Sequence, residues 1–384
     1  MIEIPKAFSS SYAQARVKFL EAAATASLRI ESFVHPLKGR DGEDLAMDIA
    51  FDGALDAKHL LIISSACHGV EGFCGSGVQV FALHDQEWRD KAREADVAVL
   101  YIHALNPYGF SHIRRVTNEN VDLNRNFQDF TKPLPAATAN EHYASLHDLL
   151  LPEQWPSTPE NIAACADWMS AKALKDSKNA DEVSGLRAFQ QTVTRGQYTH
   201  ADGLFFGGQA PTWSNRTLRN VLKKYATRCE KLAWIDLHTG LGPRGHGERI
   251  FACKDDPQAY ARASFWWGNA GNPSGETPVT SIYNGSSSSA FLTGLMWMAA
   301  YQEAPQAEYT AIAMEYGTLP VMDVLQALRA EHWLANHPET SAAQAAQIKQ
   351  QLCDAFYVDA DDWKGQIISQ GRQAMFQAVD GLKS

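Results

Sequence analysis

Four buried apolar runs of this sequence lead directly into side chains that can bind a metal ion or move a proton. "LLIISSACH" ends at His68, with Glu71 three residues later, "AWIDLH" ends at His238, and "AIAMEYG" carries Glu315. The fourth run, "YIHALNPYG", leads into the polar stretch "RRVTNENVDLNRNF". Two histidines and one carboxylate are a common ligand set of catalytic zinc sites, in which the fourth position stays open for water. The residue types therefore predict one zinc ion bound by His68, Glu71 and His238.

The spacing of these residues has a physical reason. A His-x-x-Glu pair in a turn that leads into a helix can direct both side chains at one point, and we expect Gly69 and Gly72 to let the backbone bend there. The third ligand must come from a neighbouring strand, and His238 is at the end of one. Asp236 precedes His238 by two residues and points to the same side of the strand. It either orients the His238 imidazole or caps a loop.

The elements that must position these side chains follow an α/β pattern. An apolar run at 59–66, a helical pattern of about five turns at 75–95 and a second apolar run at 96–107 form a βαβ unit, which predicts parallel strands and a right-handed crossover. Further strands are expected at 231–240, 248–253 and 309–318. The predicted fold is therefore α/β, with a mixed, mostly parallel central sheet flanked by helices. Open parallel sheets place their sites at the carboxyl ends of the strands.

The domain organisation is expected to be simple. We interpret residues 1–384 as a single catalytic domain and residues 131–230, where prolines bracket helical patterns, as a mostly helical insertion within it. Its segment "GLFFGGQAPTWSN" could line the cleft, cover it or form a subunit contact. The sequence from residue 323 onward, rich in Ala, Gln and Leu, is expected to be helical.

Composition excludes several classes of function. The net charge is −10 and no basic run is long enough to follow a phosphate backbone, so a nucleic-acid partner is not expected. Neither a signal peptide nor an apolar run of membrane-spanning length is apparent, so no membrane partner is expected. The six cysteines lack paired spacing, which favours a reducing compartment. The expected location is the cytoplasm, and the oligomeric state is left open.

A family resemblance rests on six motifs in order. His68-x-x-Glu71, "NPYG", "NVDLNRNF", "DLHTG", "SIYNGSSSSAF" and "EYG" together resemble the zinc carboxypeptidase (M14-like) family. They are most similar to its uncharacterised bacterial branch of carboxypeptidase-like proteins of unknown function (DUF2817-like). The resemblance spans residues 60–318 and implies a zinc carboxypeptidase-like, phosphorylase/hydrolase-like fold. One departure is Tyr108, where the family usually has aspartate, but Asn106, Pro107 and Gly109 preserve the turn chemistry.

The resemblance also implies roles for individual residues. His68, Glu71 and His238 match the family's zinc ligands, and Glu315 matches its general base. Arg115 matches the arginine that polarises the scissile carbonyl, with its neighbour Arg114 as the alternative.

On the substrate side, Asn124 and Arg125 match the pair that binds the terminal carboxylate. Tyr283 matches a tyrosine that covers the substrate, and Ala290 falls where the family places a residue of the specificity pocket. Two structural alternatives stay open here: "DLNRNF" could only begin a helix capped by Asp122 or Asn124, and Tyr283 could be a packed aromatic side chain.

These roles describe a zinc-dependent metallohydrolase that cleaves an amide bond next to a free terminal carboxylate. Zinc lowers the pKa of water to about 7, so that a carboxylate such as Glu315 can remove its proton. The expected partner is a small peptide or an amino-acid conjugate with a free carboxylate, although the natural substrate and its side-chain preference are not encoded in the motifs. The first alternative is a deacylase of N-acyl amino acids related to aspartoacylase and succinylglutamate desuccinylase. The second is a non-catalytic protein that binds carboxylates.

Overall fold

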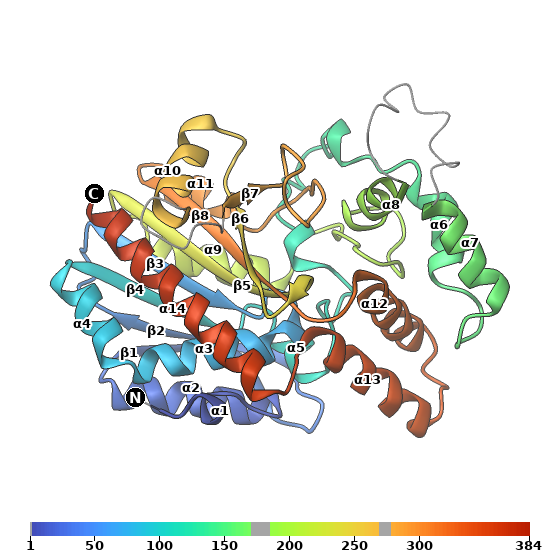
Figure 1. Ribbon diagram of the computed structural model, residues 1–384, viewed down its shortest axis with the longest axis horizontal. Coiled ribbons are helices and arrows are strands. Elements are labelled where there is room, and N and C mark those ends of the chain that lie inside the picture. Colours follow the sequence, from blue (N-terminus) through green and yellow to red (C-terminus); the bar gives the residue numbers. More distant parts are fainter. Residues whose placement is uncertain (1, 170–184, 269–277) are drawn as a thin grey trace.

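The centre of the molecule is one mixed sheet of eight strands in the order β1-β2-β4-β3-β5-β8-β6-β7 (Figure 1). The computed structural model describes residues 2–169, 185–268 and 278–384. Within them the strands are β1 (Arg29–Lys38), β2 (Asp44–Asp52), β3 (His59–Ser65), β4 (Val97–His103), β5 (Lys231–Arg244), β6 (Gly247–Phe251), β7 (Val279–Ser281) and β8 (Glu308–Gly317). The central strands β4, β3, β5 and β8 pair in parallel, and β6 also pairs in parallel with β7. The predicted α/β class with a mixed, mostly parallel sheet is confirmed.

Helices cover the sheet and extend beyond one end of it. The α-helices are α1 (Ile4–Ala7), α2 (Tyr12–Thr25), α3 (Gly72–His84), α4 (Gln86–Glu94), α5 (Pro107–Ser111), α6 (Tyr143–Leu150), α7 (Pro159–Met169), α8 (Gly185–Thr194), α9 (Trp213–Tyr225), α10 (Pro257–Trp267), α11 (Met298–Glu303), α12 (Val321–Asn336), α13 (Ala342–Phe356) and α14 (Asp361–Lys383). Short 3₁₀ turns are η1 (Gly69–Glu71), η2 (Leu123–Arg125) and η3 (Ala136–Thr138). In Figure 1, α3 and α14 lie in front of the sheet and α9 lies behind it.

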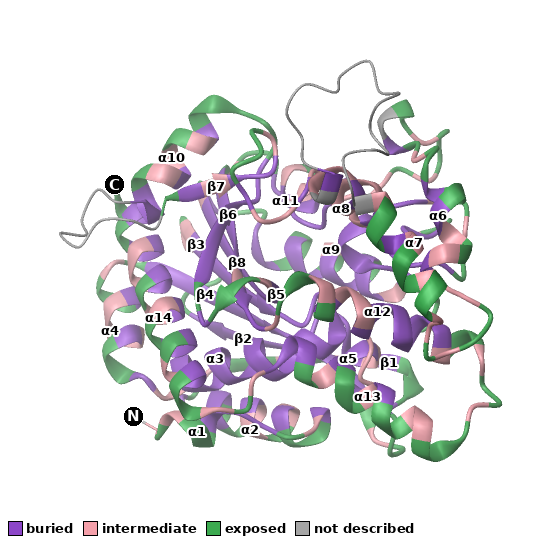
Figure 2. Cartoon of the chain, turned by 45° about the vertical axis from the view of Figure 1, so that its right-hand side comes forward, coloured by how far each residue is buried: buried purple, intermediate pink, exposed green. Residues whose placement is uncertain are grey.

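The core lies between the sheet and these helices. The strands β3 and β4 consist almost entirely of buried residues, as expected for strands that are covered on both faces (Figure 2). Trp234 of β5 and Trp88 of α4 are fully buried, and Phe51 of β2 contacts Tyr225 of α9. This two-sided packing holds the carboxyl ends of β3, β5 and β8 in fixed positions.

The predicted βαβ unit is confirmed, with one difference. β3 and β4 are parallel, but the connecting helical stretch is divided into α3 and α4 instead of forming one long helix. The division is at Asp85, whose extended backbone ends α3 and whose side chain accepts a hydrogen bond from the Trp88 N–H at the start of α4. An aspartate in this capping position favours the start of a new helix over continuation of the previous one.

Residues 131–230 contain η3, α6, α7, α8 and α9, together with one isolated bridge between Gln197 and Phe206. Residues 170–184 of this range lie outside the described part of the chain. Figure 1 shows α6, α7 and α8 grouped on the right of the view, beside α12. That this range is an insertion within a single catalytic domain stays a prediction.

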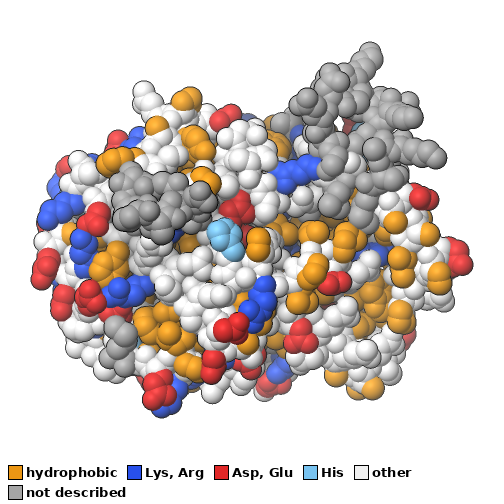
Figure 3. All heavy atoms as spheres, in the orientation of Figure 1, with side chains coloured by type: hydrophobic (Ala, Val, Ile, Leu, Met, Phe, Trp, Pro, Cys, Tyr) orange, Lys and Arg blue, Asp and Glu red, His pale blue; other side chains and the backbone are white. Residues whose placement is uncertain are grey.

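The C-terminal part of the chain is helical, and the face of the molecule shown in Figure 3 carries mixed charges. As predicted, the chain after residue 323 is helical and forms most of α12, then α13 and α14. On the face shown in Figure 3, acidic and basic side chains are intermixed, and hydrophobic side chains gather in the region of α12. Among the described residues, none of the helices combines the length and apolarity needed to cross a bilayer.

Candidate metal centre and active-site pocket

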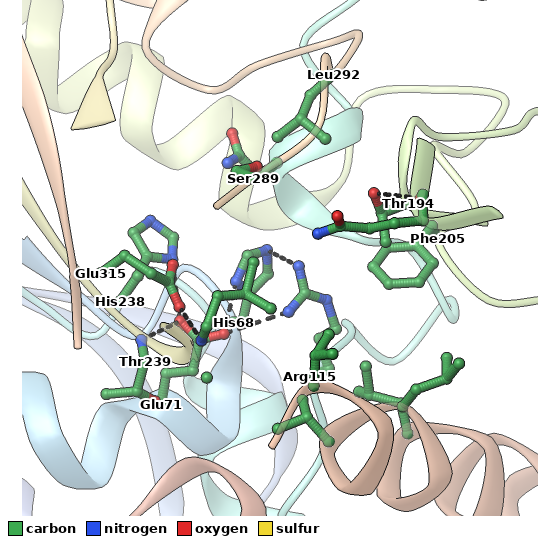
Figure 4. A pocket seen from close by; sticks show the side chains of 18 of the residues that line it. His68, Glu71, Arg115, Thr194, Phe205, His238, Thr239, Ser289, Leu292 and Glu315 are labelled. Carbon is green, nitrogen blue, oxygen red and sulfur yellow. Dashed lines mark hydrogen bonds and ion pairs between the residues drawn. The ribbon is translucent and has the colours of Figure 1, made fainter. Parts of the chain in front are cut away.

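His68, Glu71 and His238 come together at the carboxyl edge of the sheet. His68 and Glu71 follow the end of β3, on the turn that leads through η1 into α3, and His238 lies on the adjacent parallel strand β5. The Nδ1 atoms of His68 and His238 each lie 2.9 Å from a different carboxylate oxygen of Glu71. One ligand atom from each residue lies within 4.8 Å of the other two, and all three side chains are buried (Figure 4). This is the spacing expected around a single metal ion.

The turn that carries His68 and Glu71 depends on close backbone packing. A Cβ atom on Gly69 would lie 2.0 Å from the backbone carbon of Gly109, and one on Gly72 would meet the Phe110 ring at 2.5 Å. Neither glycine adopts a positive φ. The expectation that they are needed for bending is therefore wrong: they are needed because a side chain would not fit.

The Asn-Pro-Tyr-Gly turn against which Gly69 packs is intact, as predicted. The Asn106 side chain accepts a hydrogen bond from the Gly109 N–H at 2.9 Å, and its amide donates to the Arg115 carbonyl at 3.3 Å. In addition, the Gly69 and Val70 N–H groups donate to the carbonyls of Arg115 and Arg114. The turn and the arginine pair are thus fixed together.

Each imidazole has a second carboxylate on its other nitrogen. His238 Nε2 lies 2.5 Å from Asp236, and His68 Nε2 lies 3.2 Å from Asp122. Both aspartates are fully buried. For His238, a proton on Nε2 would bond to Asp236 and leave the lone pair of Nδ1 directed at the Glu71 carboxylate. Because two acceptors repel each other, that arrangement requires a cation or a second proton between them, and a bound metal ion satisfies it.

Arg115 contacts His68, Glu71 and Asp122. Its guanidinium donates to Asp122 at 3.0 Å and to Glu71 at 3.3 Å, and its third nitrogen lies 2.8 Å from His68 Nε2. A metal-bound His68 would carry its proton on Nε2 and could not accept from Arg115, so metal loading requires this one contact to be given up. Arg114, the alternative, points elsewhere: it pairs with Glu331 at 2.7 Å and bonds Asn120. The geometry therefore favours Arg115 over Arg114 for a role at the metal.

The charges of the cluster hold one another in ionised form. Although burial opposes it, the neighbouring His68 and His238 lower the pKa of Glu71. Burial likewise opposes the shift of Asp122, but Arg115 and Arg125 keep the pKa of that carboxyl well below its usual value. Asp236 and Glu71 raise the pKa of His238 well above its usual value, again against the effect of burial. The carboxylates thus favour a positive charge at His238, and a bound divalent cation would take the place of the extra imidazole proton.

Glu315 lies beside His238 on the neighbouring strand. In the parallel register of β5 and β8, the two residues are direct partners, so both side chains emerge at the same point of the sheet edge. One carboxylate oxygen of Glu315 accepts a hydrogen bond from the Leu241 N–H at 2.9 Å. Burial, followed by the negative charge of Glu71, raises the pKa of Glu315 to about 8.

A second group that could bind a metal ion shares one member with the first. Cys67, Asp236 and His238 also lie within 4.8 Å of one another. Burial and the nearby carboxylates raise the pKa of the Cys67 thiol well above its usual value, so the thiolate that a metal requires is disfavoured. The His68–Glu71–His238 group is therefore the better candidate.

These residues lie on the wall of one large pocket with an empty volume of about 1020 Å³. It contains His68, Glu71, Arg115, Asn124, Arg125, His238 and Glu315, which the sequence had singled out. Asn124 and Arg125 belong to the 3₁₀ turn η2, which begins with the Asp122 carboxylate accepting from the Asn124 N–H. In the motif "DLNRNF", Asp122 thus caps the turn, as the structural alternative predicted, and Asn124 and Arg125 also line the pocket.

Arg125 is held in place by backbone oxygens. Its guanidinium donates to the Thr194 carbonyl at 3.0 and 2.6 Å and to the Asn124 carbonyl at 2.9 Å. Burial lowers the pKa of Arg125, which is only 2% exposed. Three of the five donor N–H groups are therefore used within the chain, and two remain for a ligand.

Two substrate-side residues do not lie where the resemblance implies. The Tyr283 hydroxyl donates to the Cys253 carbonyl at 2.9 Å and its ring packs near Phe251 and Phe291. Ala290 is buried, and neither it nor Tyr283 is among the pocket-lining residues. Their neighbours Ile282 and Ser289 line the pocket instead. In this loop the residues that line the pocket are thus displaced by one position from those that the resemblance implies.

Some site residues were not recognised from the sequence. Asp122, considered only as a helix cap, contacts His68 and Arg115. Its place in "DLNRNF", two residues before Asn124, was the available signal. The N–H groups of Thr239 and Leu241, which bond Glu71 and Glu315, follow His238 within three residues, but backbone donors carry no sequence signal.

Comparison with known proteins identifies a matching family. A search of curated proteins finds no match. The model of a family described as a protein of unknown function (DUF2817) matches residues 8–370.

Among solved structures, bovine thrombin-activatable fibrinolysis inhibitor in complex with tick carboxypeptidase inhibitor is similar at 7% identity, over 98% of this chain and 97% of that chain, with a TM-score of 0.47. A metallo-carboxypeptidase from Burkholderia cenocepacia is similar at 12% identity, over 90% and 68%, with a TM-score of 0.41. One from Pseudomonas aeruginosa is similar at 10% identity, over 88% and 66%, with a TM-score of 0.35. Since the family model matches nearly the whole length, the chain belongs to the DUF2817 family, the branch that its motifs predict.

Proposed function

We propose that this protein is a zinc-dependent hydrolase that cleaves an amide bond next to a free terminal carboxylate, as a carboxypeptidase does. The observation that carries the proposal is the convergence of the His68 and His238 Nδ1 atoms on Glu71, with Glu315 in register beside His238. His68, Glu71 and His238 would hold one zinc ion. When bound, zinc supplies a Lewis acid that lowers the pKa of water and polarises the amide carbonyl.

Glu315 has the properties of the general base. Its carboxylate faces the pocket, and a pKa of about 8 places it near the working pH, where a base is most effective. The Leu241 N–H holds one oxygen, so the other is free to take a proton from water. The same carboxyl group can then return this proton to the leaving amine.

Arg115 is placed to stabilise the negative charge that develops on the carbonyl oxygen of the substrate. Two buried carboxylates orient its guanidinium and raise its pKa, so it stays charged beside the reacting group. A positioned cation of this kind stabilises the transition state more than the ground state.

Asn124 and Arg125 support recognition of the terminal carboxylate. A planar guanidinium can form two parallel hydrogen bonds with a carboxylate, and Arg125 is held rigidly by the Thr194 and Asn124 carbonyls. The side-chain oxygen of Asn124 accepts a hydrogen bond from the Met296 N–H at 2.9 Å, which leaves the side-chain NH₂ group of Asn124 available for a ligand. We retain the prediction of a cytoplasmic location as part of this proposal.

The test compares zinc-loaded wild-type protein with Glu315→Gln on peptides with free and blocked C-termini. We expect only free peptides to be cleaved, chelators to abolish cleavage, and Glu315→Gln to lower kcat by about 10² to 10⁴ while zinc content by elemental analysis is retained. Equal cleavage of blocked peptides would reject the carboxylate requirement. Activity unchanged in Glu315→Gln would reject the base, and binding of carboxylates without any turnover would favour the non-catalytic alternative.

A second candidate, an N-acyl amino acid deacylase, is favoured by the position of Tyr283. Its motif "SIYNGSSSSAF" is one of the six that resemble the carboxypeptidase family, but the Tyr283 hydroxyl bonds the Cys253 carbonyl, and neither of these residues lines the pocket. Screening N-acyl amino acids against dipeptides under identical conditions separates the two. A preference of more than about tenfold in kcat/KM for one class would assign it.

A further inference from the structure

The charged side chains of the pocket are all accounted for by the proposed reaction. The titratable residues on the wall are His68, Glu71, Arg115, Arg125, His238 and Glu315. Every other described lining residue is neutral, and most are apolar. A charged group of the substrate that lies away from Asn124 and Arg125 would therefore be buried without a partner, and burying an unpaired charge is costly.

One apolar part of the wall lies on the sheet, next to His238 and Glu315. We call it the sheet-side lobe. Ile250 of β6 and Ala313 of β8 are register partners, two residues before Glu315. The Trp297 ring lies 6.0 Å from the His238 ring in an edge-to-face arrangement. Ile282 completes this lobe.

A second apolar part lies next to the two arginines and is built by α8, α12 and the loop before α9. We call it the helix-side lobe. The Phe205 ring lies 5.1 Å from the Arg115 guanidinium and 5.6 Å from that of Arg125 (Figure 4). The carbonyl of the α8 residue Thr194 accepts hydrogen bonds from Arg125, which fixes α8 against this arginine. The members of this lobe are Phe189, Val193, Phe205, Val324, Leu325 and Leu328.

The spacing of the lining residues on α8 and α12 shows that each helix presents an apolar face to the pocket. Phe189 and Val193 are four residues apart on α8, and Val324 and Leu328 are four apart on α12, so each pair shares one face of its helix. Val321, at the start of α12, also lines the pocket and is 39% exposed. The charged cluster thus lies between two apolar lobes.

We infer that the substrate carries an uncharged, apolar group on each side of the scissile amide, and that the helix-side lobe binds one of the two. This inference rests on the proposed function and narrows its substrate class to acyl or peptidyl conjugates of apolar amino acids. Each CH₂ group buried in a lobe favours binding by about fourfold. A charge in either lobe disfavours it by about 10- to 100-fold.

The test uses the zinc-loaded full chain and four conjugates, all with a free carboxylate: hexanoyl-leucine, succinyl-leucine, hexanoyl-glutamate and succinyl-glutamate. We expect kcat/KM for hexanoyl-leucine to exceed that of every charged conjugate by about 10- to 100-fold. Equal or higher values for a charged conjugate would overturn the inference.

A charge introduced into the helix-side lobe provides the second arm. Leu325 is only partly buried, so Leu325→Lys can be accommodated and should raise the relative kcat/KM of one singly charged conjugate by about tenfold or more. The matched control is Ala335→Lys, which adds the same charge at an exposed position of α12 outside the pocket. If the two variants give the same preferences, the helix-side lobe does not bind the substrate.

Direct binding separates failure of this inference from failure of the proposed function. If no conjugate is hydrolysed, titration calorimetry of the same four conjugates still measures the preference. Tighter binding of hexanoyl-leucine without turnover would reject the hydrolase and retain the apolar class. Equal binding of all four would reject the apolar class.

Discussion

At the scale of single residues, the two candidate histidine ligands are oriented by buried carboxylates. Asp236 lies between His238 and Ser64, whose hydroxyl donates to it at 2.5 Å, and the Trp234 indole N–H in turn donates to Ser64 at 2.6 Å. The chain of bonds fixes which nitrogen of His238 faces Glu71. Of the two roles open for Asp236, the contacts favour orientation of the imidazole over capping of a loop.

The first prediction concerns this orientation. Asp236→Asn should weaken zinc binding by about 10- to 100-fold, because the amide no longer favours a proton on His238 Nε2. Competition with a chromogenic chelator measures the affinity. The control is Asp85→Asn, a buried carboxylate that pairs with Arg372 far from the pocket and should leave zinc affinity unchanged. Equal affinities of wild type and Asp236→Asn would contradict the assigned role.

The second prediction concerns Glu315 and pH in chelator-treated protein. Its pKa is raised to about 8 from 4.5, so between these values the folded state keeps a proton that the unfolded chain has lost. The free energy of unfolding therefore falls as the pH rises from about 4.5 to 8, by at most about 1.4 kcal/mol per pH unit. Glutamine does not titrate, so the free energy of unfolding of Glu315→Gln should not show this fall. Relative to wild type, the variant should therefore become more stable from pH 5 to pH 8, as measured by urea unfolding. A difference that is constant with pH would show that Glu315 ionises normally.

At the scale of secondary-structure elements, α12 binds Arg114, the neighbour of Arg115 in the chain, on the side away from the pocket. Glu331 of α12 is buried and accepts hydrogen bonds from Arg114 and from Lys349 of α13, both at 2.7 Å. Arg114 and Arg115 accept backbone hydrogen bonds from the turn that carries Glu71. The position of α12 is thus coupled to the position of Arg115 in the pocket.

The third prediction follows from this coupling. Glu331→Gln should lower the free energy of unfolding by about 3 kcal/mol, because Arg114 and Lys349 lose a buried anion. It should also lower kcat/KM while zinc content stays nearly unchanged, since Arg114 loses the partner that anchors the backbone next to Arg115. The control Glu303→Gln removes a carboxylate that pairs with Arg219 away from the pocket, and kcat/KM should stay unchanged. A destabilised Glu331→Gln with normal kcat/KM would limit Glu331 to a structural role.

At the scale of the whole molecule, the metal centre joins segments that are distant in the sequence. The turn after β3 and the strand β5 supply the three candidate ligands, and the end of β8 supplies Glu315 beside them; β5 lies between β3 and β8 in the sheet. A metal ion held by both the turn after β3 and the strand β5 can bind only to the folded chain, so it stabilises that state.

The fourth prediction is that zinc raises the free energy of unfolding. At a free zinc concentration of about 100 times the dissociation constant, the increase is about 2.7 kcal/mol, and a chelator should reverse it. Thermal unfolding with and without chelator measures the effect. His238→Ala should unfold at the same temperature in both conditions, and a chelator effect as large as that of wild type would place the metal elsewhere.

What the sequence determined by itself was the local and the chemical part of this protein. Apolar runs of strand length predicted the strands, their order with the helices predicted a parallel βαβ unit, and the motifs predicted the DUF2817 family. His68, Glu71 and His238 could be chosen as a group because ligand types at strand ends meet at one edge of a parallel sheet. The family prediction rests on a resemblance of motifs, and the other conclusions depend on residue type and periodicity, which are properties of short segments.

Only the tertiary structure decided which side chains face the pocket. It directs Arg115 inward and Arg114 toward Glu331, keeps Tyr283 and Ala290 off the wall, and places Phe205 under the arginines. These outcomes depend on the direction of each side chain and on contacts between segments such as α8 and α12, which lie more than a hundred residues apart. Packing between distant segments leaves no periodic signal in the sequence, so the apolar lobes became visible only in the folded chain.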